Sequence, residues 1–132
     1  MESSNIFRLY IIGGYNNTVF YSQILEWTYV LSQFGVITTC LSILTDKSKL
    51  IDIKKQEEIK SRINGDFQQI VIGRTPFLNQ VKITKNVIHY YKRLHSQNEG
   101  SKIIIQFRRQ IPIFIIIIKL FSKIKIIYES RG

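Results

Sequence analysis

The sequence predicts an α/β fold, a Rossmann-like parallel sheet of about five strands joined by helical crossovers. Apolar runs rich in β-branched residues recur along the chain and alternate with segments whose apolar residues have helical spacing. Several of these runs are continuously apolar, as strands covered by helices on both faces are. Because strands that alternate with helices pair in parallel through right-handed crossovers, one sheet with helices on both faces is expected.

The apolar runs mark the predicted strands. In chain order they are 6–13, 36–44, 68–73, 102–107 and 125–130. Each is rich in Ile or Val, which favour extended backbone.

Four helices are expected between the strands. The first, 18–34, has Asn17 or Thr18 as its N-cap and Gly35 just beyond its end. Its helical stripe consists of Tyr21, Ile24, Leu25, Thr28 and Leu31.

The other three helices have less regular patterns. The second, 52–63, has Asp52 as N-cap and Ile53, Ile59 and Ile63 among charged residues, so it is expected to lie exposed over the sheet. The third, 79–95, ends in a basic cluster that suits a helix C-terminus. The fourth, 111–122, starts with Pro112, although its four consecutive isoleucines also fit a strand.

Length and composition bound the class of protein. With 132 residues, 45% hydrophobic and 21% charged, the chain is expected to form one globular domain over 1–132. Cys40 is the only cysteine, so no internal disulfide is possible, and a reducing cytoplasm is the expected compartment. The N-terminus does not resemble a signal peptide, and the longest apolar run, 113–118, is too short to span a bilayer.

The positive charge is unevenly distributed. Residues 1–46 contribute −2 to the net charge of +10, because they hold one basic residue, Arg8, against three acidic ones. Residues 47–132 hold 18 basic and six acidic residues. This asymmetry predicts a polyanionic neighbour, either nucleic acid or an anionic membrane surface, the latter being the inner face of the membrane. A bias toward Lys and Ile in the composition is an equally good explanation.

Ligands of open parallel sheets bind outside the carboxyl ends of the strands. Three of the five predicted strand ends carry arginine, so Arg74, Arg108 and Arg131 are expected to converge on one edge. In the alternative interpretation these arginines are solvated, and one of them pairs with Glu129. After the first strand, Gly13 and Gly14 allow close approach of a ligand ahead of a helix N-terminus.

Several site classes find no support in the sequence. It lacks the G-x-G-x-x-G dinucleotide fingerprint, the P-loop motif and D-x-D. His89 and His95 are six residues apart, which does not place them on one helix face, so no metal site is expected.

The C-terminal segment "IIQFRRQIPIFIIIIKLFSKIKIIYESRG" resembles part of the N-terminal domain of family 4 glycosyltransferases, which have the two-domain GT-B fold. There a His-x-Arg turn and a helix precede a D-x-R-G. In this sequence Gln106 and Arg108 take the first two places, and Glu129, Arg131 and Gly132 take the D-x-R-G. The early "YIIGGYNNTVFYSQILEWTYVLSQFG" is also similar to the first strand, glycine loop and helix of such enzymes.

The resemblance implies transfer of a sugar from a nucleotide-sugar donor to a glycan or lipid-linked acceptor in cell-surface polysaccharide synthesis. No cofactor beyond the nucleotide-sugar substrate is implied. Gly13 and Gly14 would border the donor phosphates, and Arg74, Arg108, Glu129 and Arg131 would line the acceptor side. The family's E-x₇-E signature, in its C-terminal domain, has no counterpart here, so an incomplete N-terminal domain that is inactive alone is expected.

Two other functions remain open. One is a basic α/β module that binds RNA or an anionic membrane surface through its Lys and Arg residues from residue 82 onward. The other is a Rossmann-like small-molecule binding protein. An unfinished sheet edge would also favour self-association.

Overall fold

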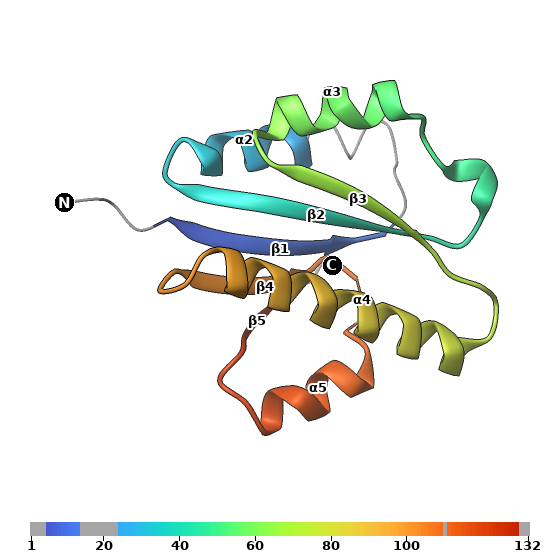
Figure 1. Cartoon of the computed structure of the whole chain (residues 1–132). Helices are drawn as coiled ribbons and strands as arrows, with labels where there is room; N and C mark the ends of the chain where they lie inside the picture. The colour runs from blue at the N-terminus through green and yellow to red at the C-terminus, as the bar shows by residue number, and fades with distance from the viewer. Residues whose placement is uncertain (1–4, 14–23, 110, 130–132) are drawn as a thin grey trace.

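A five-stranded parallel sheet organises the molecule (Figure 1). The computed structural model describes residues 5–13, 24–109 and 111–129. The strands are β1 (Ile6–Ile12), β2 (Val36–Leu44), β3 (Asp66–Val71), β4 (Lys102–Phe107) and β5 (Lys125–Tyr128). Their order across the sheet is β3-β2-β1-β4-β5, and every neighbouring pair is parallel. The predicted α/β fold with helical crossovers is therefore confirmed.

Helices cover both faces of the sheet. Figure 1 shows α2 (Glu26–Ser32) and α3 (Ile53–Ile63) on one face, and α4 (Pro76–Gln97) and α5 (Ile113–Leu120) on the other. Each face has its own core. Tyr10, Cys40 and Phe67 pack with α3 and with Ile24 and Leu25, which precede α2, whereas Leu9, Ile11, Leu41 and Phe107 belong to the core shared with α4 and α5. This division explains why the inner strands are apolar at consecutive positions.

The helix boundaries follow local signals closely where the structure describes them. Asp52 caps α3, since its carboxylate accepts a hydrogen bond from the Lys55 N–H at 2.8 Å, as predicted. Ile59 and Ile63 are buried, but Ile53 is 75% exposed. Only two of the three isoleucines named in the sequence therefore contact the sheet. The first predicted helix, 18–34, is described only from residue 24 onward, and its N-cap candidates and Tyr21 lie outside the described residues.

Two other elements begin earlier than expected. The helix α4 begins at Pro76, three residues before the predicted start, because Pro occupies its first turn, where no N–H donor is needed. Asn79 then closes the preceding loop by exchanging two hydrogen bonds with Gly73, at 2.9 and 2.8 Å. The strand β3 begins at Asp66, two residues before the predicted strand. The segment with four isoleucines is helical, as α5.

No helix among the described residues combines the length and the apolar character that a membrane span requires. The apolar run within α5 occupies an eight-residue helix that lies against the sheet.

Gly65 marks the tightest approach of backbone to backbone in the turn between α3 and β3. A Cβ atom at this position would lie inside van der Waals contact with the carbonyl oxygen of Thr38 in β2. The turn therefore requires glycine for space, because only a residue without a Cβ atom lets the α3–β3 turn pack this closely on β2.

We expect Gly65→Ala to lower the free energy of unfolding by about 2 kcal/mol, because the backbone of β2 must move to admit the methyl group. Gly73→Ala is the control, since its Cβ would meet only the Asn79 side chain, at an ordinary 3.9 Å. Urea unfolding followed by circular dichroism measures both. Equal stability of the two variants would contradict the tight approach.

Candidate functional site

Four of the predicted site residues lie within the described part of the chain, at the ends of strands. Gly13 follows β1, Arg74 follows β3, Arg108 follows β4 and Glu129 follows β5. Gly14 and Arg131 lie outside the described residues. Arg74 is exposed, and β2 and β1 separate its strand from β4, so it occupies the opposite flank of the same sheet edge from Arg108 and Glu129.

Backbone hydrogen bonds hold Arg108 and Glu129 beside each other. The Arg108 N–H donates to the Ile11 carbonyl and the Glu129 N–H donates to the Phe107 carbonyl, each at 2.8 Å. These bonds continue the sheet ladder one residue past β4 and β5. Arg108 and Glu129 are thus placed by the sheet itself.

The carboxylate of Glu129 collects hydrogen bonds from three side chains. The Tyr10 hydroxyl donates to Oε1 at 2.6 Å, and the Gln106 amide donates to the same oxygen at 3.2 Å. The Arg108 guanidinium forms an ion pair with Oε2. The interpretation in which one arginine pairs with Glu129 is therefore confirmed for Arg108, and the pair is only partly exposed.

A second arginine lies beneath this pair. Arg8 is buried in β1, with 7% of its surface exposed. Its guanidinium donates to the Thr38 hydroxyl at 3.0 Å and to the Thr28 hydroxyl at 2.8 Å. It also donates to the Gln106 side-chain oxygen at 3.1 Å and lies over the Tyr10 ring, 4.2 Å from its centroid.

Arg8 therefore connects β1, β2, β4 and α2 through one side chain. The sequence did not predict this role, because Arg8 lies inside a strand and the predicted site residues follow the strand ends. The available signal was a lone arginine inside an apolar strand, which requires compensating partners in the fold.

Burial shifts the titration of this cluster. Desolvation lowers the pKa of Arg8, although Tyr10 and Glu129 oppose the shift. Burial, followed by the hydrogen bond to Glu129, raises the pKa of Tyr10 from 10.0 to about 12. With two guanidinium groups against one carboxylate, the cluster carries a surplus positive charge at neutral pH.

A cavity of about 290 Å³ opens onto this cluster. Besides the polar side chains it is lined by Trp27 and Leu31, and 64% of the Trp27 surface is exposed. The cavity thus combines an aromatic face with hydrogen-bonding groups and positive charge, a combination that suits a polar organic ligand. Its lining consists of Arg8, Tyr10, Trp27, Thr28, Leu31, Gln106 and Glu129.

Another hollow, of about 240 Å³, lies on the opposite face of the sheet, beside the starts of α4 and α5. Arg109 lines it, and one terminal nitrogen of its guanidinium is buried with no hydrogen-bond partner among the described residues. Burial lowers the pKa of Arg109. Arg108 and Arg109, neighbours in sequence, therefore serve opposite faces of the sheet.

Within the described ranges, no group of three or more His, Cys, Asp and Glu side chains is arranged to hold a metal ion. The functional groups of the candidate site are the guanidinium groups of arginine, the tyrosine hydroxyl, the glutamine amide and the glutamate carboxylate.

No protein-family model and no curated protein matches the sequence. The fold is similar to that of the C-terminal domain of the PF1911 hydrogenase from Pyrococcus furiosus. The TM-score is 0.51 at 11% sequence identity, with 98% of this chain and 95% of that chain covered. At this identity the likeness concerns the arrangement of strands and helices alone, and it supports the Rossmann-like fold.

The raised pKa of Tyr10 predicts a loss of stability in alkali. Between pH 10 and about 12 the unfolded chain loses the tyrosine proton while the folded chain keeps it, so this contribution is complete below pH 10 and falls as pH rises. Urea unfolding of the wild type and Tyr10→Phe measures it. We expect the difference in unfolding free energy between them to narrow by roughly 1 kcal/mol from pH 8 to pH 11. A difference that stays constant with pH would show that Tyr10 ionises normally.

Proposed function

We propose that this chain supplies the acceptor-binding part of a GT-B glycosyltransferase, in which a sugar passes from a nucleotide-sugar donor to a glycan or lipid-linked acceptor. One juxtaposition carries the proposal. Gln106 and Arg108 come from the segment that resembles the His-x-Arg turn, and Glu129 comes from the segment that resembles D-x-R-G. The three side chains form one hydrogen-bonded cluster.

The reaction of this class makes a specific demand on the protein. The acceptor hydroxyl oxygen forms a bond to the anomeric carbon of the sugar, while the bond from that carbon to the nucleoside diphosphate breaks. Negative charge then accumulates on the departing diphosphate, and cations or backbone amides stabilise it. The surplus positive charge of the cluster on this sheet edge is of the required sign.

Within the proposed site, Glu129 is a positioning residue. Its carboxylate already accepts hydrogen bonds from Tyr10, Gln106 and Arg108, so it is better suited to hold the Arg108 guanidinium than to receive a proton. Arg108 is assigned to the acceptor side. Gly13 and Gly14 are assigned to the donor phosphates, and Arg74 and Arg131 remain predicted acceptor-side residues.

Trp27 extends the proposed site outward. It is the only tryptophan of the chain, it lines the cavity, and its indole is largely exposed. The flat apolar face and polar N–H of an indole match a sugar ring, which has apolar faces and hydroxyl edges. Because no other tryptophan contributes, tryptophan emission, excited selectively over tyrosine, reports directly on this cavity.

The proposal is tested by titrating the chain with chitotriose, as a neutral glycan, and with farnesyl phosphate, as a short lipid phosphate, while Trp27 fluorescence is recorded. We expect a saturable change with at least one probe. Arg108→Gln should weaken that binding about tenfold, because a charged hydrogen-bond donor is lost.

Arg93→Gln is the matched control. It removes the same charge from an exposed position near the C-terminal end of α4, far along the helix from the carboxyl edge of the sheet. Circular dichroism of both variants checks that they fold. The absence of any saturable change in the wild type, or an equal loss in both variants, would refute the acceptor site.

A further inference from the structure

The outward side of α5 is apolar although nothing in the described structure covers it. Ile113, Ile116, Ile117 and Leu120 follow the spacing i, i+3, i+4 and i+7, so they form one stripe. Their exposed fractions run from 45% for Ile117 to 73% for Leu120, whereas Ile115, on the inward side, is 2% exposed. The helix therefore has a second apolar stripe that the core does not use.

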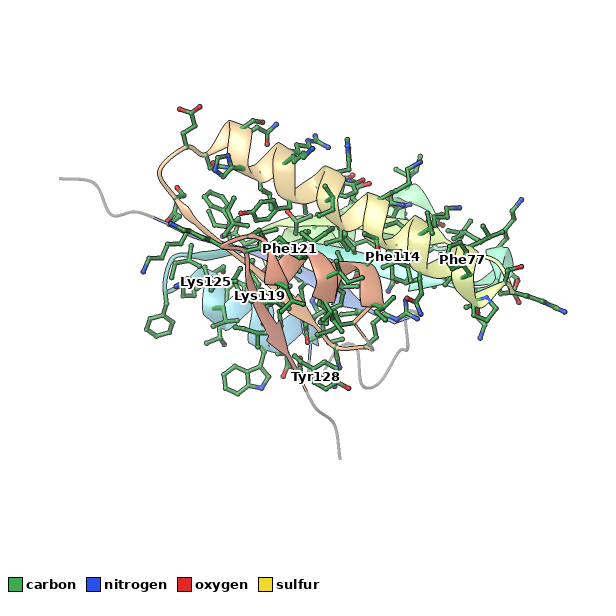
Figure 2. All side chains as sticks on the ribbon, turned by 90° about the horizontal axis from the view of Figure 1, so that it is seen from below. Phe77, Phe114, Lys119, Phe121, Lys125 and Tyr128 are labelled. Carbon is green, nitrogen blue, oxygen red and sulfur yellow. The ribbon has the colours of Figure 1, made fainter. Side chains whose placement is uncertain are left out.

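Aromatic side chains extend this stripe at both ends. Phe77, at the start of α4, is 63% exposed and packs edge-to-face on Phe114, with 5.8 Å between ring centroids. Phe121, just after α5, is 85% exposed, and Tyr128 at the end of β5 is 55% exposed. Figure 2 shows α5 in front of the sheet with these aromatic residues on the same side of the molecule. Together with the stripe they form what we call the α5 face.

Lysines border the α5 face. Lys119, at the end of α5, and Lys123, which follows it, are exposed, and Figure 2 shows Lys119 on the same side as the aromatic residues. The wider charge pattern has the same sign. Residues 67–128 contain eleven Lys and Arg residues and a single acidic residue, Glu99. The apolar face is thus set in a region that attracts polyanions.

We propose that the α5 face docks on an anionic lipid membrane surface. A bilayer interface accepts apolar and aromatic side chains at the boundary between headgroups and acyl chains, and its anionic headgroups attract the bordering lysines. Both halves of the observation, the exposed apolar stripe and the excess of cations, are then explained by one partner.

Two other partners explain only half of it. An RNA would use the cations and could stack bases on the exposed aromatic side chains, but it would leave the stripe of isoleucine and leucine between them without a complementary apolar surface. A second copy of the chain would use the apolar stripe, but a two-fold contact between identical faces would bring the lysines of one copy against those of the other. Anionic lipid is favoured because it complements the charge as well as the apolar surface.

Co-sedimentation of the whole chain with lipid vesicles tests the proposal. We expect binding to phosphatidylcholine vesicles that contain about one third phosphatidylglycerol, a decrease with added salt, and little binding to pure phosphatidylcholine. The double variant Leu120→Ser with Phe121→Ser should lower the partition coefficient at least tenfold. The double variant with Lys119 and Lys123 each changed to Ala should lower it roughly 25-fold, at about fivefold per lysine.

Matched variants on the opposite side of the sheet serve as controls. Leu50→Ser with Phe34→Ser removes the same two residue types from exposed positions. Changing Lys47 and Lys49 to Ala removes the same charge from exposed positions. Both controls should bind anionic vesicles like the wild type.

Three outcomes would overturn the proposal. Equal binding to neutral vesicles, or equal loss in the control variants, would show that the α5 face does not recognise anionic lipid. Concentration-dependent dimers that the Leu120 and Phe121 substitutions abolish, without vesicle binding, would assign the face to a second copy. Tight binding to polyuridylate that displaces vesicles would assign it to RNA. Because the Trp27 cavity is on the other face of the sheet, the sugar titration succeeds or fails independently.

Discussion

The buried guanidinium of Arg8 is the constraint on which the candidate site depends. Among the described residues it is the only charged side chain that is buried, so its hydrogen-bonding groups require partners within the fold. The hydroxyls of Thr28 and Thr38 and the amide oxygen of Gln106 meet this need. Since the Gln106 oxygen is engaged by Arg8, its amide nitrogen is directed to Glu129, which in turn holds Arg108. The arrangement of the side chains of Gln106, Glu129 and Arg108 is thus linked to the burial of the Arg8 guanidinium.

Much of the fold follows from sequence periodicity, because the strands are continuously apolar and the helices carry recognisable caps such as Asp52. What periodicity does not contain is the order of strands across the sheet. That order places two strands between β3 and β4, and it therefore separates Arg74 from Arg108, although both follow parallel strands. The exposure of a side chain also depends on residues far away in the sequence. The isoleucines of α5 have the composition of a buried helix, and only the surrounding packing shows that one of its two apolar stripes remains uncovered.

The candidate site was predictable in part for the same reasons. Arg108 and Glu129 could be named because they follow strands, where the ends of parallel strands form one edge. Tyr10 and Trp27 could not, because they are brought to the cavity by strand pleat and by the docking of α2, which no short motif records. Arg8 was marked in the sequence only as a lone arginine in an apolar strand, which does not identify its partners. The two faces of the sheet consequently differ in character. The side with α2 and α3 holds the polar cluster, and the side with α4 and α5 presents an apolar, basic surface.

The central position of β1 affects how the chain emerges from the ribosome. β1 is made before β2 and β4, and it pairs with β2 on one edge and with β4 on the other. The second partner of Ile6, Lys102, is therefore synthesised 96 residues later. A nascent chain that ends after β3 contains three paired strands whose innermost strand is still an open edge. During that interval the amide oxygen that later satisfies Arg8 has not yet been synthesised. If β1, β2 and β3 pair before β4 is made, the arrival of β4 closes the open edge of β1 and supplies the missing hydrogen-bond acceptor of Arg8 in one step.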